Sequence, residues 1–344
     1  MADSYLNSIF LAAQAKQAAN KQAFEFRNRE WGALNAFKDD TPLTSPDLAN
    51  LKNAPQRPTE ALFLKKIDRT TTNALACTPT GIQGGSGKQS VTWTTIAKSI
   101  LFDYKQAQNN QYADMILSNL LMEAEASIWD AMDTAAITYL NANRTNVNAA
   151  DGKMDFTWDD TNFYSTVTKA QEQYFYNLAY SEMKLNNYSN GYKSIHNTNW
   201  ESVIRYANAQ GQANSVDLGF QYTGIGASWN MYSSNNIVAD GANKHGIYLI
   251  PSGALSLGLW VDPAYRKPVQ HGGDRRWFLM DSIFYPGVKI QVMELQACAD
   301  TSANGGTTQS QTVTYELSIQ YSLNHAILST AGETPIFKHN VAAA

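Results

Sequence analysis

Residues 112–143 read YADMILSNLLMEAEASIWDAMDTAAITYLNAN and contain neither Gly nor Pro. Apolar side chains recur every three or four positions, which places them on one face of an α-helix. At about 1.5 Å per residue such a helix is roughly 48 Å long, well above the usual three turns. The stretch therefore predicts one long, uninterrupted helix. Its apolar positions are Tyr112, Ile116, Leu117, Leu120, Leu121, Ala124, Ile128, Met132, Ala136, Ile137 and Leu140.

The charged side chains of this predicted helix are all acidic. They are Asp114, Glu123, Glu125, Asp130 and Asp133. A carboxylate-bundle metal site would need Glu-x-x-His signatures, and the helix has none. We therefore interpret these residues as a solvated acidic face.

The C-terminal part of the chain has the pattern of a long antiparallel hairpin. Val288, Ile290 and Val292 alternate with polar residues, and the alternation returns over residues 313–323. Residues 301–311 (TSANGGTTQSQ) form a polar loop between them. We expect one face of this hairpin to be buried.

The hydrophobic periodicity of the N-terminal third is weaker than that of residues 112–143. Residues 5–26 have helical spacing with a thin apolar stripe, which indicates a peripheral arm. Residues 39–58 hold four prolines and are expected to be irregular. Residues 63–102 are predicted to form a long β-hairpin with a Gly-rich tip at 78–88 (TPTGIQGGSGK).

The middle of the chain mixes helices and strands. Asp159 and Asp160 mark the start of a second predicted helix, because carboxylates satisfy free N–H groups at a helix N-terminus. The elements expected here are helices at 161–184 and 200–209 and strands at 218–222, 227–231, 246–250 and 255–261.

Composition excludes several classes of function. Charged residues make up 16% of the 344 residues, against about 25% in typical proteins. The 26 basic and 30 acidic residues form no basic cluster, which argues against a nucleic-acid binder and a membrane-surface protein. Two distant cysteines, Cys77 and Cys298, fit a reducing compartment. Asp3 precedes a very short apolar run, so no signal peptide is expected.

The chain shows no motif for catalysis or for a cofactor. The Gly81–Gly87 spacing is one residue too long for a phosphate-binding loop, and Gln89 replaces the Ser or Thr after its Lys. No G-x-S-x-G occurs, and the five histidines lack metal-ligand spacing. We therefore expect no enzyme, no cofactor and no metal.

The order of these elements, together with local motifs, resembles the major capsid protein of tailed bacteriophages, which has the Hong Kong 97-type fold. The resemblance covers residues 63–338. The stretches that carry it are 69–77, 92–102, 133–136, 140, 144–145, 251–255, 260–263, 298–300 and 335–338.

This resemblance implies an α+β fold with five regions. They are an N-terminal arm (1–58), an extended β-hairpin loop (59–106), a spine helix with a peripheral-domain helix (107–190), an axial domain (191–287) and a C-terminal long hairpin with its tail (288–344). It also implies a structural protein that assembles as hexamers and pentamers into an icosahedral shell around double-stranded DNA. Low charge and abundant Tyr and Trp suit such extensive interfaces.

The implied partners are other copies of the chain, portal and scaffolding proteins, and packaged DNA without sequence-specific contacts, but no membrane. The expected location is the virion capsid, after synthesis in the host cytoplasm. The residues expected at assembly interfaces are Tyr5, Phe10, Gly81, Gly84, Gly85, Gly87, Lys88, Asn304, Gly305 and Gly306.

Three alternatives stay open on the sequence alone. An encapsulin-like compartment shell would share the fold and enclose a cargo enzyme. An extracellular adhesin or binding module would fit the Asn, Thr and Tyr content, but it should carry a signal peptide and β-rich repeats. A hydrolase would need a catalytic constellation that the sequence does not display.

Overall fold

The structure is a computed structural model. It describes residues 8–9, 11–13, 15, 31–39, 55–64, 86–103, 110–144, 148, 150–188, 191–205, 229–266, 269–271, 275–285, 287–300, 309–326 and 334–342.

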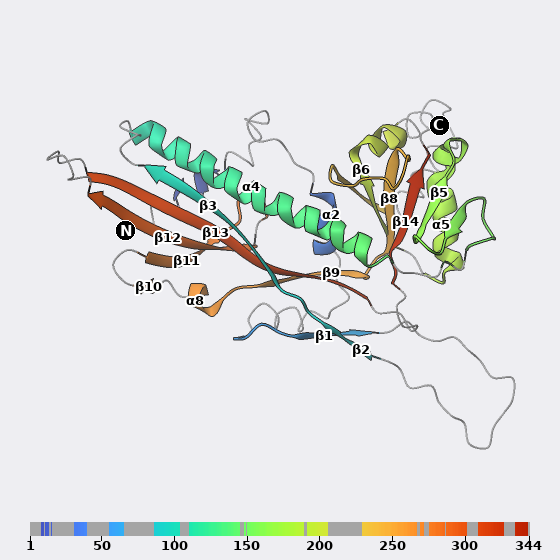
Figure 1. Cartoon of the computed structure of the whole chain (residues 1–344), viewed down its shortest axis with the longest axis horizontal. Coiled ribbons are helices and arrows are strands. Elements are labelled where there is room, and N and C mark those ends of the chain that lie inside the picture. The colour runs from blue at the N-terminus through green and yellow to red at the C-terminus, as the bar shows by residue number, and fades with distance from the viewer. Residues whose placement is uncertain are drawn as a thin grey trace, which may run out of the picture.

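The predicted long helix is confirmed as α4 (Asn110–Ala142), which has 33 residues. Most of its apolar stripe is buried: Leu117, Leu121 and Met132 are at most 1% exposed, whereas Ile116, also counted in the predicted stripe, is exposed. The helix ends where the backbone and side-chain amides of Asn143 both donate to the carbonyl of Tyr139, at 3.1 and 2.8 Å. An unbroken stripe and a defined end make α4 a straight rod through the molecule (Figure 1).

The face of α4 that carries this stripe covers a six-stranded sheet, here called the long sheet. Its order is β10-β11-β12-β13-β3, and β9 also pairs with β13. Side chains of α4, β3, β11, β12 and β13 share one buried cluster. The strands are β3 (Thr94–Asp103), β9 (Leu255–Trp260), β10 (Val269–His271), β11 (Arg275–Asp281), β12 (Lys289–Asp300) and β13 (Gln309–His325).

The C-terminal hairpin is confirmed. β12 and β13 pair antiparallel from Gln291 opposite Ser318 to Asp300 opposite Gln309. The alternating side chains of β13 turn one face toward α4, and Tyr315 and Leu317 are at most 1% exposed. β13 starts at Gln309, inside the predicted loop.

The predicted 63–102 hairpin is correct only in its outer part. β1 (Glu60–Leu64) pairs with β2 (Ser86–Ser90) as a two-stranded ribbon. β3 instead pairs with β13, from Thr94 opposite Tyr321 to Asp103 opposite Thr312. The apolar side chains of β3 explain this, since Ile100 and Phe102 are buried in the cluster under α4 and a protruding ribbon could not bury them.

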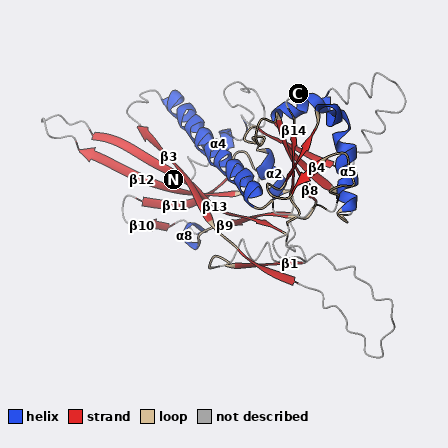
Figure 2. Ribbon diagram, turned by 45° about the vertical axis from the view of Figure 1, so that its right-hand side comes forward, coloured by secondary structure: helices blue, strands red, loops and turns tan. Residues whose placement is uncertain are grey.

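A second six-stranded sheet, here called the short sheet, lies at the C-terminal end of α4. Its order is β4-β5-β14-β8-β6-β7. Its strands are β4 (Thr157–Asp159), β5 (Tyr164–Val167), β6 (Tyr192–Asn197), β7 (Trp229–Ser234), β8 (His245–Pro251) and β14 (Phe337–Val341). Helix α5 (Phe175–Leu185) packs on this sheet (Figure 2), and Phe175, Ala179 and Met183 are buried there.

The second helix predicted at 161–184 is wrong in its first half. Residues 157–167 form β4 and β5, and a 3₁₀ helix (Lys169–Tyr174) leads into α5. Asp159 does satisfy free N–H groups, but those of a turn: its Oδ1 accepts from the amides of Thr161 and Asn162, at 2.8 and 3.0 Å. A side chain that caps a turn and one that caps a helix have the same sequence signal.

Several shorter elements agree with the sequence. Strands predicted at 227–231, 246–250 and 255–261 correspond to β7, β8 and β9, and residues 201–205 are helical. The predicted strand at 218–222 lies outside the described residues. In the predicted 5–26 helix the described positions are helical, and Ile9 and Ala13 are buried in the cluster under α4.

Several elements were not predicted, among them β10, β11 and β14, and two more need explanation, α2 and β6. Helix α2 (Gly32–Lys38) is short, and the residue at its N-cap, Trp31, makes no side-chain capping hydrogen bond. β6 is buried at all six positions although it contains Lys193 and His196. Both elements lie where the two sheets meet.

Replacing Leu121 by Ala is expected to lower the free energy of unfolding by about 2–5 kcal/mol, because the cavity would open in the interface between α4 and the long sheet. Chemical denaturation of the purified subunit measures this. The matched control is Ile116→Ala on the same helix, where the side chain is 45% exposed, and the change should stay within about 0.5 kcal/mol. Equal losses for the two variants would contradict the burial of this stripe.

Candidate functional site

The acidic residues of α4 do not form one solvated face, which corrects the sequence interpretation: Asp114 and Glu123 are exposed, but Glu125 and Asp133 are buried. Glu125 is fully buried and accepts hydrogen bonds from the backbone amides of Ile283 and Phe284, at 2.9 and 3.3 Å from the nearer oxygen. The Ser282 hydroxyl and the Trp129 indole N–H also donate to it. Burial raises the pKa of Glu125, and these donors partly oppose the rise. The carboxylate thus fixes the turn after β11 onto α4.

Asp133 does the same for two other segments. It is fully buried, and its Oδ1 accepts from the backbone amide of Leu34 in α2 at 3.0 Å. Its Oδ2 accepts from Ser234 Oγ at 2.6 Å and from Asn236 Nδ2 at 3.0 Å. Burial raises the pKa of Asp133 despite these bonds. One turn away, Asp130 accepts from the indole N–H of Trp31 at 2.7 Å.

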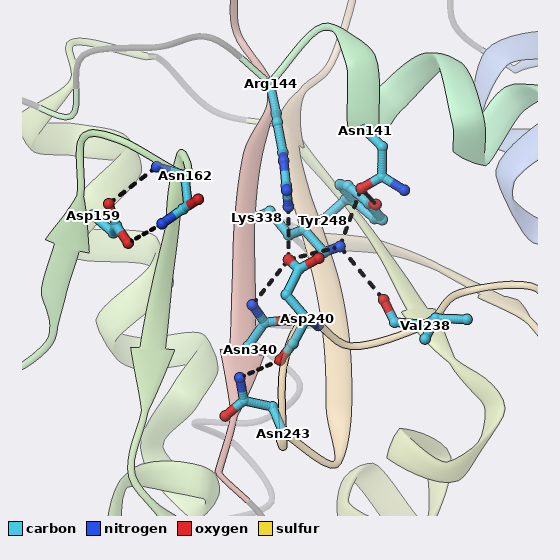
Figure 3. A network of polar contacts seen from close by, with 10 residues as sticks. All are labelled: Asn141, Arg144, Asp159, Asn162, Val238, Asp240, Asn243, Tyr248, Lys338 and Asn340. Carbon is cyan, nitrogen blue, oxygen red and sulfur yellow. Dashed lines mark hydrogen bonds and ion pairs between the residues drawn. The ribbon is translucent and has the colours of Figure 1, made fainter.

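A polar network joins the end of α4 to the short sheet (Figure 3). Its centre is Asp240, whose Oδ2 lies 2.7 Å from Arg144 Nη1 and 3.0 Å from Lys338 Nζ. Asn340 donates to the same oxygen at 3.2 Å, and Asn243 donates to the Asp240 carbonyl at 2.6 Å. Burial opposes ionisation of Asp240, but the Arg144, Lys338 and Asn340 bonds outweigh it and lower its pKa.

Lys338 is 1% exposed and is the buried cation of this network. Its Nζ donates to Asn141 Oδ1 at 3.1 Å and to the Val238 carbonyl at 3.4 Å, and it lies 5.2 Å from the ring centre of Tyr248. The Tyr248 hydroxyl donates to the same Asn141 oxygen at 2.5 Å. Burial lowers the pKa of Lys338, while Asp240 opposes that change. A buried ammonium with this many partners fixes geometry more than it adds stability.

The end of α4 and the two residues after it contact the short sheet and its connections through three polar pairs. They are Asn141 with Tyr248, Asn143 with Thr334, and Arg144 with Asp240. Tyr139 instead bonds His325, the last residue of β13 in the long sheet, at 2.7 Å. Burial lowers the pKa of His325 to about 4, so its ring is neutral at pH 7. The first two thirds of α4 pack on the long sheet. Each end of α4 thus belongs to a different sheet.

Among the residues predicted at assembly interfaces, two lie in a described element. Gly87 and Lys88 are in β2, opposite Phe63 and Leu62 of β1. Lys88 is therefore part of the paired ribbon, not of its tip. The other predicted interface residues lie outside the described residues: Tyr5, Phe10, Gly81, Gly84, Gly85, Asn304, Gly305 and Gly306.

The base of the ribbon is fixed to the long sheet. The Trp93 indole N–H donates to the Pro58 carbonyl at 2.7 Å, and the Arg57 guanidinium lies 5.3 Å from the ring centre of Trp260 in β9. The Trp93 ring also lies beside Gly258 of β9, whose register partner in β13 is Ser322. The ribbon therefore leaves the molecule from a rigid attachment.

The structure also contains a Ser–His–Glu set that the sequence did not indicate. Ser165 Oγ bonds His339 Nδ1, and His339 Nε2 lies 2.9 Å from Glu182 Oε2. The three residues come from β5, β14 and α5, so no local motif could reveal them. All three are 0% exposed, and Phe156 and Phe175 lie edge-on to the His339 ring at 5.3 and 5.4 Å. The set offers no accessible nucleophile and serves to join three elements.

The described part of the chain holds no group of three or more His, Cys, Asp or Glu side chains that could bind a metal ion. No described helix is long and apolar enough to cross a membrane.

Comparisons with known proteins show similarity in structure only. No family model and no curated protein matches the chain. A solved structure titled "Mycobacterium phage Cain" aligns over 94% of both chains at a TM-score of 0.51 and 13% identity. One titled "Mycobacterium phage Bobi" aligns over 94% of both at 0.50 and 12%. The chain therefore has the fold of these two mycobacteriophage proteins.

A third structure, "Capsid of Ralstonia phage GP4", aligns over 85% of this chain and 86% of its own, at 8% identity and a TM-score of 0.44. That score is too low to support the fold by itself. The expected mixture of helix and sheet is confirmed by the structure, and the similarity to phage proteins holds at the level of the fold.

Replacing Asp240 by Asn should destabilise the chain by about 1–3 kcal/mol at neutral pH, because Lys338 and Arg144 lose their anion. The ion pairs lower the folded pKa of Asp240 below its ordinary value of 3.8. Its contribution is therefore complete above that value and is lost as pH falls through the folded pKa. Urea unfolding of both proteins over a pH series should show the gap closing at acidic pH.

The control for this experiment is Asp160→Asn, an exposed carboxyl in the turn after β4, for which unfolding should match the parent. A gap between D240N and the parent that stays constant at acidic pH would contradict the ion-pair assignment.

Proposed function

We propose that the chain is a major capsid protein that assembles as hexamers and pentamers into an icosahedral shell enclosing the double-stranded DNA of a tailed phage. The observation that carries the proposal is the fold shared over 94% of both chains with two mycobacteriophage structures. The interior supports it too, since the most catalysis-like set, around Ser165 and His339, is buried and structural. Shell proteins need surfaces that bind other copies of the chain and extended segments that contact neighbouring subunits; they do not need a substrate cleft.

The five regions expected from the sequence fit this role. The ribbon β1–β2 would lie on a neighbouring subunit, with Gly81, Gly84, Gly85, Gly87 and Lys88 at or near the contact. Tyr5 and Phe10 of the arm and residues 304–306 of the C-terminal loop would contact further copies. Portal and scaffolding proteins would be partners, and the packaged DNA would be enclosed without sequence-specific contacts. The subunit would be made in the host cytoplasm and end in the virion capsid.

Expression of the chain alone should yield closed shells, tubes, or discrete pentamers and hexamers, since the fold supplies its own mating surfaces. Sedimentation gives the particle mass, and negative-stain imaging of the same fraction gives the shape. Co-expression with a scaffolding protein of the same phage is the second condition. A stable 38.0 kDa monomer in both conditions and at every salt concentration would contradict the proposal.

The ribbon offers a second test. Leu64 and Ser86 are cross-strand partners, so a two-residue Asn-Gly turn can replace residues 65–85 and close the hairpin. The shortened chain should keep the melting temperature of the parent, because the base of the ribbon stays anchored by Trp93. It should lose closed shells, which sedimentation would show. Normal shells from the shortened chain would contradict the assembly role of the ribbon.

A further inference from the structure

Helix α2 has two faces that belong to two different cores. Trp31 and Leu34 lie in the buried cluster of α4 and the long sheet. Ala33, Ala36 and Phe37 lie in a separate cluster with short-sheet residues such as Ile195, Tyr248 and Ile250. The two faces are offset around one short helix, as helical periodicity requires. α2 is therefore inserted between the two halves of the molecule (Figure 2).

On the side of α4 and the long sheet, α2 is fixed by directional contacts. The Leu34 amide donates to Asp133 Oδ1 at 3.0 Å, and Tyr285, in the turn after β11, donates its hydroxyl to Asn35 Oδ1 at 2.9 Å. The Trp31 ring packs edge-on against Phe284 at 5.2 Å. These contacts set the position of α2 relative to the long sheet.

On the side of the short sheet, the contacts are equally specific. Lys193 of β6 is 2% exposed and donates its Nζ to the Ala36 carbonyl at 2.7 Å. Trp31 forms a β-bridge with Ser234, the last residue of β7. Gly32 lies so close to β7 that a Cβ there would stand 2.1 Å from the Ser233 carbonyl oxygen. Any side chain at position 32 must push α2 and β7 apart.

We propose that α2 is a wedge that sets the angle between the long and short sheets, and that this angle determines the curvature of the assembled shell. The second half of this statement rests on the proposed capsid function, and the first half does not. Outside α2, side chains at the end of α4 and Leu255 of β9 share a buried cluster with Ile195, Tyr248 and Ile250 of the short sheet. With these contacts alone, α4 could still bend or rotate where it meets the short sheet. Helix α2 packs in both cores and so prevents this motion.

The test measures the angle in the unassembled subunit. Cysteines at exposed positions Lys98 in β3 and Asn177 in α5 carry spin labels, in a chain with Cys77 and Cys298 replaced by Ser. Pulsed electron resonance then gives the distance distribution between the two sheets. Gly32→Ala separates α2 from β7, and Asn35→Ala removes the bond to Tyr285. Each should shift or broaden the distribution relative to the labelled parent.

The matched control is Val167→Ala, which opens a cavity in the short sheet in a cluster that α2 does not join. It should lower the melting temperature and leave the distance distribution unchanged. If Gly32→Ala fails to fold, Asn35→Ala still decides the question, because it deletes one half-buried hydrogen bond and adds no clash. Parent-like distributions in the folded wedge variants would overturn the proposal.

Particle diameter separates this inference from the capsid proposal. Where the parent forms shells, the wedge variants should give a changed or wider diameter distribution in electron micrographs, and Val167→Ala should match the parent. Altered distances with unchanged diameters would overturn the link to curvature. If the parent forms no shells under any condition, the capsid proposal fails, while the distance measurement still tests the wedge.

Discussion

The rest of the structure depends on α4 being a single rod whose buried carboxylates bind other segments. Glu125 and Asp133 each accept several hydrogen bonds from chain segments far away in sequence. A buried carboxylate is costly unless its oxygens are satisfied, so each one defines where its donors must lie. Apolar packing of α4 on the long sheet provides most of the stability, since it is non-directional and scales with area. The two carboxylates fix the positions of the segments that donate hydrogen bonds to them.

Burial and charge shift carboxyl pKa values in opposite directions in the middle of α4 and at its C-terminal end. In the middle, burial raises the pKa of Glu125 and Asp133, so the folded chain favours their protonated forms more than the unfolded chain does. The contribution of these two groups to the free energy of unfolding therefore falls as pH rises from their unfolded pKa values to their higher folded ones. At the end, Arg144 and Lys338 keep Asp240 ionised. The carboxyl groups in the middle of α4 are fully buried, whereas Asp240 at its C-terminal end is partly exposed.

The sequence predicts what a local pattern can encode and misses what arises from distant contacts. The α4 stripe and the β12–β13 alternation are periodic, and both are confirmed. β6 is missed because Lys193 and His196 break its apolar run, yet both are buried with polar partners. The acidic face is misread because Glu125 has donors more than 150 residues away. α2 is too short for periodicity, and its stability comes from the two cores that enclose it.

The same reasoning explains why the Ser–His–Glu set is structural. A nucleophile must present a lone pair to a substrate, whereas Ser165 and His339 are opposite each other in parallel strands and enclosed by aromatic rings. Filling a core with polar pairs makes the register of β5 and β14 specific, because a one-residue slip would leave each group unpaired. Such polar pairs supply a positional specificity that extra apolar area would not. The buried polar contacts at β5–β14, at Asp133 and at Asp240 thus fix the elements that they join in one arrangement.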